Sequence, residues 1–409
     1  MSLEVHLDWR GQTSLVGRLH VAERGASVSF EYASEWLRHD SAFAIDPTSL
    51  PLQQGAHHRA ALFGAIQDCG PDRWGRMLIE RAVRRKVLPQ RPYRDMDYVL
   101  ALDDVARVGA LRFRFDAASP FLAATVGKLP PLVRLGALLR ATDALQTETE
   151  SAEDLRFLLG AGSPLGGARP KSTVSLTDER VAIAKFPKPD DTRDIAAGEI
   201  LALTLAAQAG LQVAEHQLVA ADRHSIAVIT RFDRAGKQRI PFISGMTLLG
   251  LPPGDPGAYT LLADGIRRFG HDVPGDLREL WRRLIFSLLA SNCDDHLRNH
   301  GFLMREPGRW SLSPAYDINP VPEVERARIG KTRISEDQAE PTITGALEAA
   351  PRFGLKSAEA RRILGEVFAA VSGWRTTGKR LRLKASTLDA YASAFQHPLM
   401  DETSQLLGR

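Results

Sequence analysis

The chain has 409 residues, of which 44% are hydrophobic and 25% are charged. These are the proportions of a folded globular protein, and they exclude a disordered, collagen-like or coiled-coil chain. The 53 Lys and Arg residues against 49 Asp and Glu residues give a net charge of +4, which permits an anionic ligand but does not by itself indicate a nucleic-acid-binding protein.

The number of cysteines and the hydropathy of the sequence indicate where in the cell we expect the protein. Cys69 and Cys293 are the 2 cysteines, and their spacing predicts neither a disulfide scaffold nor a zinc site. The first residues lack the apolar core of a secretory signal, and no apolar run is long enough to span a membrane. We therefore expect a soluble cytoplasmic protein without a membrane partner.

The first third of the chain begins with predicted strands. Residues 3–52 contain short segments of alternating polarity, separated by turn signals at Arg10-Gly11 and Arg24-Gly25. This pattern predicts antiparallel strands of a small sheet.

Helical periodicity follows after Pro51. Helices are predicted over 59–66, 72–85 and 131–148, with a strand at 109–115 between them. We place a domain boundary after residue 148, which gives an N-terminal domain at 1–148 and a catalytic domain at 149–409.

The second domain is predicted to begin with a helix and a glycine-rich loop at 160–171, after which strands come first and helices later. Strands are expected at 172–176, 180–186, 216–221 and 225–232, and helices at 199–210, 276–291 and 358–371. Strands first and helices afterwards indicate an α+β unit of two lobes rather than a doubly wound sheet.

A glycine-rich segment at 162–171, GSPLGGARPK, comes just before the first of these strands. Glycines let main-chain N–H groups approach a phosphate closely, and Lys171 adds positive charge. The segment is neither of the common phosphate-loop patterns, so a glycine-rich surface turn is an equal alternative on these residues alone.

Lys185 lies among apolar residues in the predicted strand at 181–186, VAIAKF. An ammonium held on a strand is able to pair with the phosphates of ATP, and Glu199 at the start of the next helix is a candidate ion-pair partner. A lysine whose stem extends along a half-buried strand is the simpler alternative.

Asp294 and Asn299 follow a helix that is predicted to be buried, and they lie five residues apart. This is the spacing of the Asp and Asn in the kinase catalytic loop, where the carboxylate takes the hydroxyl proton and the amide oxygen binds magnesium. A mononuclear metal hydrolase is an alternative, but it lacks a second cluster of His and Asp.

Asp317 comes eighteen residues after Asn299, behind a predicted hairpin with Pro307-Gly308 as its turn. A kinase has its second magnesium-binding Asp at this point. An ordinary turn-forming Asp is the alternative. A Gly-rich loop, a strand Lys, a helix Glu, an Asp–Asn loop and a later Asp occur in the order that phosphoryl transfer on a kinase-like fold requires.

These segments together resemble the HipA-type serine/threonine kinases, the toxin component of bacterial HipBA toxin–antitoxin modules. The segments that carry the resemblance are GGARPK (166–171), IAKFP (183–187), TRFDR (230–234), DDHLRN (294–299) and PAYDINP (314–320), with VGRL (16–19), SFEYASEWL (29–37), PDRWGR (71–76) and VGALRF (108–113) in the N-terminal part. The resemblance implies a kinase-like C-terminal unit, with a small strand-rich lobe and a larger helical lobe, preceded by a small β-rich N-terminal domain.

The resemblance also implies roles for individual residues, with ATP and Mg²⁺ as cofactors. Asp294 corresponds to the catalytic base, and Asn299 and Asp317 correspond to the magnesium ligands. The implied ATP contacts come from the glycine-rich loop, the strand lysine, a hinge segment and the neighbours of the metal ligands: Gly166, Gly167, Ala168, Arg169, Pro170, Lys171, Lys185, Thr230, Arg231, Phe232, His296, Asn299, Tyr316 and Asp317.

One position departs from the family. The self-inhibitory serine of the family lies seven residues before the loop lysine, and this chain has Pro164 there. Ser163 is its neighbour and the candidate autophosphorylation site. A phosphoserine there would add about −1.5 to −2 charge beside the ATP phosphates and would favour an outward loop.

The function that the resemblance implies is a protein serine/threonine kinase that inhibits translation and growth by phosphorylating an aminoacyl-tRNA synthetase or a related factor. Its partner would be a helix-turn-helix antitoxin of HipB type, which would make most of the DNA contact, because this chain has no convincing helix-turn-helix. A small-molecule kinase and a catalytically idle co-repressor subunit are the alternatives. The GGARPK loop and the N-terminal domain argue against the first, and the intact Asp294, Asn299 and Asp317 argue against the second.

Overall fold

The computed structural model describes residues 1–22, 27–123, 129–161, 168–178, 180–323, 325, 329–338 and 340–408. The chain forms two compact units. The first consists of Met1–Asp190, Val219–Ile243 and Glu306–Gly308, and the second of Asp191–Leu218, Ser244–Arg305 and Arg309–Arg409.

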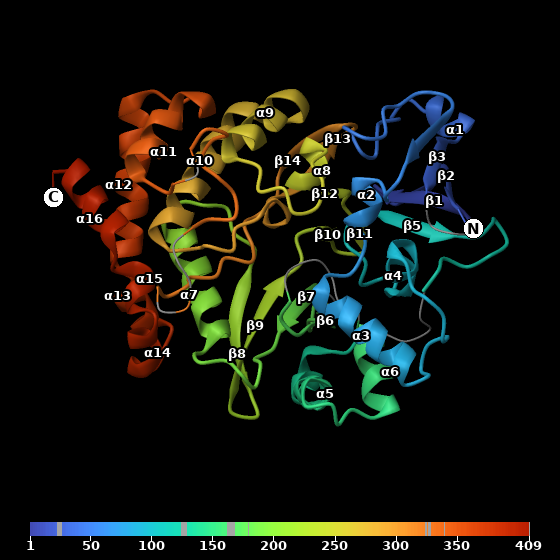
Figure 1. Ribbon diagram of the computed structural model, residues 1–409, viewed down its shortest axis with the longest axis horizontal. Coiled ribbons are helices and arrows are strands. Elements are labelled where there is room, and N and C mark those ends of the chain that lie inside the picture. The colour runs from blue at the N-terminus through green and yellow to red at the C-terminus, as the bar shows by residue number, and fades with distance from the viewer. Residues whose placement is uncertain are drawn as a thin grey trace. The chain divides into compact units, whose positions relative to one another are not determined.

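The first unit begins with an antiparallel sheet of order β4-β3-β2-β1-β5 (Figure 1). Its strands are β1 (Ser2–Trp9), β2 (Gln12–Val21), β3 (Val28–Tyr32), β4 (Ala56–Arg59) and β5 (Leu111–Arg114). Arg10 and Gly11 join β1 to β2 with φ angles of 52° and 78°, as a two-residue hairpin turn requires. The strands predicted from alternation in this region are confirmed.

Among its described residues, the first unit also contains six α-helices and one 3-10 helix. They are α1 (Ser34–Leu37), α2 (Gly64–Gln67), α3 (Arg73–Arg84), α4 (Asp95–Ala101), η1 (Leu132–Arg134), α5 (Leu135–Gln146) and α6 (Ala152–Ala161). The helix predicted over 59–66 is wrong in its first half. Arg59 is the last residue of β4, which pairs with β3, and residues 60–63 connect β4 to α2, so strand pairing overrides helical periodicity only at Arg59.

A second sheet of order β6-β7-β9-β8 follows, formed by β6 (Lys171–Ser175), β7 (Val181–Lys185), β8 (His216–Ala221) and β9 (His224–Thr230). Its apolar face shares one core with α3, α5 and α6 through buried residues such as Trp74, Leu138, Leu155, Val174 and Val228. Residue 148 therefore lies between two helices of a common core, and the division into domains there stays a prediction. Short strands β10 (Arg234–Ala235), β11 (Gln238–Arg239) and β12 (Phe242–Ser244) follow β9.

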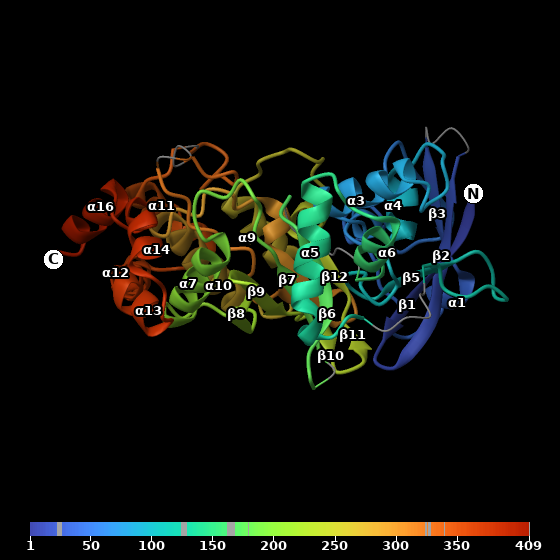
Figure 2. The same ribbon diagram turned by 90° about the horizontal axis from the view of Figure 1, so that it is seen from below.

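The second unit is mostly helical. Its longer helices are α7 (Ile195–Gln208), α9 (Tyr259–Phe269), α10 (Val273–Leu289) and α12 (Ser357–Ser372), and its shorter ones are α8 (Gly245–Leu249), η2 (Leu297–Asn299), α11 (Ile343–Ala349), η3 (Ala350–Phe353), α13 (Trp374–Arg380), α14 (Ala385–Ala390), α15 (Ala392–Phe395) and α16 (Pro398–Leu406). α10 contacts α9, α11, α12 and α16, and Figure 2 shows these helices gathered around it. Its buried residues include Trp281, Leu284 and Ile285.

The predicted hairpin is present as β13 (Gly301–Glu306) and β14 (Arg309–Leu312), with Gly308 in the turn at φ 70°. Strands concentrated in the first half and helices in the second make this an α+β fold, as the sequence predicts. Within the described residues, every helix is too short or too polar to cross a lipid bilayer.

Candidate catalytic loop and nucleotide-binding residues

The candidate catalytic loop starts where α10 ends. Asp272 caps the start of α10 by accepting a hydrogen bond from the Gly275 N–H at 3.1 Å, and the helix packs against α9 and α12. Ser291 then adopts φ 49°, a left-handed conformation that directs the chain out of the helix and into 292–299.

Asp294 and Asn299 are linked within this loop. The Asn299 side-chain amide donates to the main-chain carbonyl of Asp294 at 3.2 Å, while its Oδ1 is buried and has no hydrogen-bond partner. The Asp294 side chain is 44% exposed and forms an ion pair with Lys331. The loop therefore presents an accessible carboxylate and an amide oxygen with unused acceptor capacity.

The segment that carries Asp317 is fastened beside this loop. The Tyr316 hydroxyl donates to the carbonyl of Arg298 at 2.7 Å, and the Asn319 N–H donates to Asn292 Oδ1 at 3.0 Å. Asp317 itself has φ 55°, and its Oδ1 accepts from Asn319 Nδ2 at 3.1 Å. An aspartate tolerates this left-handed backbone better than most residues do. The structure thus brings together the loop and the acidic residue that the sequence predicts as partners.

The pKa of His296 depends on its burial and on the charges of two nearby acidic residues, Asp294 and Asp317. Burial lowers the pKa of His296, and the negative charges of Asp317 and Asp294 oppose this shift without cancelling it. The imidazole is therefore mostly neutral near neutral pH, and its Nδ1 is buried without a hydrogen-bond partner.

These residues fit magnesium better than a transition metal. Among the described residues, no three His, Cys, Asp or Glu side chains converge as a metal-binding group. Mg²⁺ that is bound together with phosphates needs only one or two protein carboxylates, because phosphate and water oxygens supply its other ligands. The Asp317 carboxylate and the unpartnered Oδ1 of Asn299 are oxygen donors of this kind.

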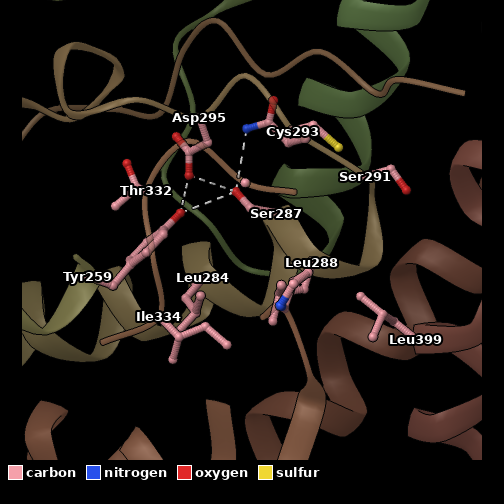
Figure 3. A pocket seen from close by; sticks show the side chains of 13 residues that line it. Tyr259, Leu284, Ser287, Leu288, Ser291, Cys293, Asp295, Thr332, Ile334 and Leu399 are labelled. Atoms are coloured by element: carbon pink, nitrogen blue, oxygen red, sulfur yellow. Dashed lines mark hydrogen bonds between the residues drawn. The ribbon is translucent and has the colours of Figure 1, made fainter. Parts of the chain in front are cut away.

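A buried polar cluster below the loop was missed by sequence reasoning. Asp295 accepts hydrogen bonds from the hydroxyl of Tyr259 and, at 3.1 Å, from the hydroxyl of Ser287 (Figure 3). His300 Nε2 lies 3.2 Å from the other oxygen of Asp295, but this contact does not meet hydrogen-bond geometry. Tyr259, Ser287 and Asp295 line a pocket of about 490 Å³, counting space open to solvent. The same three residues and His300 also line a smaller cavity. No local pattern singles out Tyr259, which lies 36 residues before Asp295.

The protonation states of this cluster follow from burial and charge. Burial alone would raise the pKa of Asp295, but the attraction of His300 and the hydrogen bonds from Tyr259 and Ser287 lower it. Burial and the Asp295 charge hold the pKa of Tyr259 well above its usual range. Asp295 therefore accepts as a carboxylate and Tyr259 donates as a neutral phenol.

The two candidate ATP-binding lysines belong to the first unit, on adjacent strands. Lys171 on β6 is paired in register with Lys185 on β7, so their side chains share one face of the sheet. Lys171 is buried and forms an ion pair with Asp72, the N-cap of α3. The Phe186 N–H donates to the Pro170 carbonyl at 2.9 Å, so the end of the glycine-rich loop is fastened to the strand of Lys185.

The remainder of the glycine-rich loop is only partly described. Ser163, Gly166 and Gly167 lie outside the described residues. Ala168 is exposed, Arg169 is half-buried and Pro170 is buried.

The proposed hinge residues follow β9. Thr230 pairs with Ala182 of β7, and the Arg231 N–H donates to the Val181 carbonyl at 2.8 Å, so this N–H is already used. The Phe232 ring lies against Phe242 with a centroid distance of 6.4 Å.

The Arg231 side chain has a structural partner instead. Its guanidinium donates to the carbonyls of Ala106 and Arg107 at 2.6 and 3.0 Å and to both carboxylate oxygens of Asp233 at 2.8 and 2.6 Å. Asp233 also accepts from the Gly109 N–H at 2.8 Å. We name these five residues the Arg231 anchor. It joins the end of β9 to the turn before β5.

Asp233 is an ionised, buried member of this anchor. Burial alone would raise its pKa, but the guanidinium groups of Arg231 and Arg234 hold the pKa of Asp233 well below its usual range. The TRFDR segment, which the sequence suggested as an adenine-binding hinge, thus carries a buried ionic contact within the first unit.

Comparison with known proteins gives matches along most of the chain. Residues 7–114 match the model of the HipA N-terminal domain, and residues 163–374 match that of the HipA-like C-terminal domain. A Sinorhizobium fredii protein named "Putative kinase Y4mE" is 28% identical over 386 residues, which are 83% of this chain and 84% of that protein. A Haemophilus influenzae protein named "Putative kinase" is 28% identical over 189 residues, 40% of this chain and 55% of that protein.

Among solved structures, the fold is similar to a chain of the HipA, HipB and operator DNA complex of the Shewanella oneidensis toxin–antitoxin system. The TM-score is 0.74 at 18% sequence identity, over 99% of this chain and 97% of that one. The predicted fold, a β-rich N-terminal region followed by a kinase-like part, is confirmed by this likeness.

Proposed function

The chain belongs to the HipA family, and on that premise we propose that it is a protein serine/threonine kinase that uses ATP and Mg²⁺ and acts as the toxin of a toxin–antitoxin module. The names of two relatives describe kinases, which agrees with phosphoryl transfer as the type of reaction.

The observation that carries the proposal is the arrangement of Asp294, Asn299 and Asp317. The bond from Asn299 to the Asp294 carbonyl sets the amide so that Oδ1 is left for a metal, and hydrogen bonds fasten the Asp317 segment alongside. Phosphoryl transfer depends mainly on positioning and charge stabilisation, and this geometry supports both.

Each residue then has a proposed role. Asp294 accepts the proton of the substrate hydroxyl, and Asn299 and Asp317 hold Mg²⁺, which neutralises phosphate charge when bound. The neutral His296 donates a hydrogen bond to a phosphate oxygen. Lys185, on β7, supplies positive charge to the ATP phosphates.

We further propose a helix-turn-helix antitoxin of HipB type as partner, with DNA contact mainly through that antitoxin. The complex of the Shewanella oneidensis protein with HipB and operator DNA supports this proposal by likeness of fold. The proposed target is a serine or threonine of an aminoacyl-tRNA synthetase or a related translation factor.

The test compares the full chain with its Asp294→Asn variant after incubation with ATP and Mg²⁺, by intact-mass spectrometry and by phosphate transfer to candidate synthetases. An amide is unable to accept the hydroxyl proton, so we expect a loss of about 10²–10⁴ in rate, with nucleotide binding retained.

Asp389→Asn is the matched control, because Asp389 is also an exposed carboxylate in an ion pair, at 2.9 Å from Arg375. Near-normal phosphorylation by Asp294→Asn would contradict the assignment of the base. Transfer to small alcohols but to no protein would replace the proposal by the small-molecule kinase.

A further inference from the structure

The Asp295 cluster joins three separate parts of the second unit directly below the candidate catalytic loop. Tyr259 begins α9, Ser287 lies in the last turn of α10, and His300 precedes β13. Tyr259 and Ser287 direct their hydroxyl groups at the carboxylate of Asp295, as Figure 3 shows. His300 Nε2 lies 3.2 Å from the other oxygen of the same carboxylate, and the neighbours of Asp295 in sequence are Asp294 and His296.

We propose that Tyr259, Ser287 and His300 are positioning residues, which act through Asp295 to hold the loop 294–299 in the geometry needed for phosphoryl transfer. The activity part of this inference rests on the proposed function. None of these residues is assigned a contact with substrate or nucleotide.

The geometry restrains the loop at both ends. Asp295 is held from below by two hydroxyl groups, and His300 directly follows the candidate metal ligand Asn299. The contact of 3.2 Å between Asp295 Oδ1 and His300 Nε2 therefore closes a ring that contains Asn299. The His300 carbonyl accepts from the Gly245 N–H at 2.7 Å, which fastens this end of the ring to α8.

The cluster is also packed so that its geometry is well defined. Asp295 and His300 are both buried, and the Tyr259 ring meets the His300 ring edge to face at a centroid distance of 5.1 Å. A buried carboxylate that loses one donor is strongly driven to find another partner, because unsatisfied charge is unfavourable in the interior. Asp295 would then move, and Asp294 and His296 would move with it.

A displacement of about 1 Å in a reacting group lowers the rate of the chemical step by about 10²-fold, even when the substrate and the nucleotide bind as before. The inference therefore predicts an effect on kcat rather than on nucleotide affinity. A merely structural cluster would instead change stability and leave kcat of the folded fraction unaltered.

The decisive variant is Tyr259→Phe, which removes one hydroxyl and keeps the ring. Tyr98→Phe is its matched control, because Tyr98 is also buried and its hydroxyl donates to a carboxylate, Glu80, at 3.0 Å in the first unit. For Tyr259→Phe we expect kcat for phosphate transfer to fall at least about tenfold with KM for ATP within about twofold of wild type, and for Tyr98→Phe we expect wild-type kcat.

Ser287 supplies the rescue by conservative substitution. Ser287→Ala should lower kcat in the same direction as Tyr259→Phe, and Ser287→Thr, which keeps the hydroxyl, should restore most of it. Unchanged kcat in Tyr259→Phe, or equal kcat in the Ala and Thr variants, would overturn the inference.

Amide hydrogen exchange over 294–300 gives a readout that does not require activity. We expect faster exchange there in Tyr259→Phe than in wild type and in Tyr98→Phe. If the wild type transfers no phosphate, the proposed function fails, and exchange still decides whether the cluster holds the loop. Identical exchange in all three proteins would show that it does not.

Discussion

The side-chain amide of Asn299 donates to the main-chain carbonyl of Asp294 at 3.2 Å, and this bond determines which face of the amide remains for a metal. The donor nitrogen is used inside the loop, and Oδ1 is left buried and unpartnered. One hydrogen bond thus couples the residue proposed to take the proton to the residue proposed to hold Mg²⁺.

The first prediction concerns that metal site. Asp317→Asn keeps a residue that tolerates φ 55° but removes the negative charge, so it separates loss of charge from backbone strain. We expect Mg²⁺-dependent ATP affinity to fall at least about tenfold and metal-free affinity to stay unchanged, as measured by calorimetry with Mg²⁺ and with a chelator. Equal ATP affinity of the wild type under the two conditions would contradict the metal assignment.

The second prediction concerns the Arg231 anchor. Asp233→Asn keeps the shape of the side chain but leaves two buried guanidinium groups without their common carboxylate. Breaking a buried ion pair on one side lowers the free energy of unfolding by about 3 kcal/mol or more, which urea titration measures. The exposed Asp389→Asn should change it by less than about 1 kcal/mol, and similar losses in the two variants would argue against the anchor.

The third prediction separates two roles of Asp72. Its side chain pairs with Lys171 and also caps α3 by accepting from the Gly75 N–H at 2.8 Å. Asn is as good a cap as Asp, so Asp72→Asn removes only the charge and should destabilise the chain by roughly 3 kcal/mol. Asp72→Ala should lose about 1 kcal/mol more, and equal stability of the two variants would show that the cap contributes nothing.

The fourth prediction concerns pH. Burial raises the pKa of Asp276 from 3.8 to about 6. The folded state therefore binds the proton more tightly than the unfolded state, so the contribution of Asp276 to stability is complete below about pH 4 and is lost as the pH rises through about 6. Asp276→Asn should gain up to about 3 kcal/mol over wild type between about pH 4 and pH 8 in urea unfolding. A constant difference between the two proteins across this range would contradict the raised pKa.

The fifth prediction concerns Ser163, which lies outside the described residues. With Pro164 in the slot of the family's serine, Ser163 is the hydroxyl available in the glycine-rich loop for autophosphorylation. Long incubation with ATP and Mg²⁺ should add one phosphate to the wild type and none to Ser163→Ala, by intact mass. The same gain in both proteins, or none in either, would place regulation elsewhere.

The sequence predicts correctly those elements whose conformation depends on residues that are close together in the chain. The Arg10-Gly11 turn, the helix at α3 and the hairpin around Gly308 each follow from residues close in sequence. Asp294 and Asn299, which the sequence pairs by their spacing, are joined by a hydrogen bond in one loop. Five residues are enough for the chain to fold back on itself, so this contact is also local.

Long-range contacts explain what the sequence did not reveal. Sequence alone does not assign a role to Asp295, because its partner Tyr259 lies 36 residues earlier in the chain and belongs to no motif. The side chain of Arg231 meets carbonyl groups 125 residues earlier in the chain, so nothing local distinguishes its structural contact from a hinge. The roles of the candidate site residues and the domain boundary at 148 stay predictions.

The Arg231 anchor has a consequence for chimaeras built from this chain and a relative. The matched N-terminal domain ends at residue 114 and the matched C-terminal domain begins at 163, which looks like a natural point for recombination. Yet Arg231 and Asp233 bind main-chain groups of residues 106–109, so the contact crosses that point. A chimaera of two relatives keeps Arg231 and Asp233 paired only if the turn at 106–109 from the other relative presents its carbonyl and N–H groups in the same positions. The two domains are therefore compatible when the main-chain conformation of this turn is the same, whatever its side chains are.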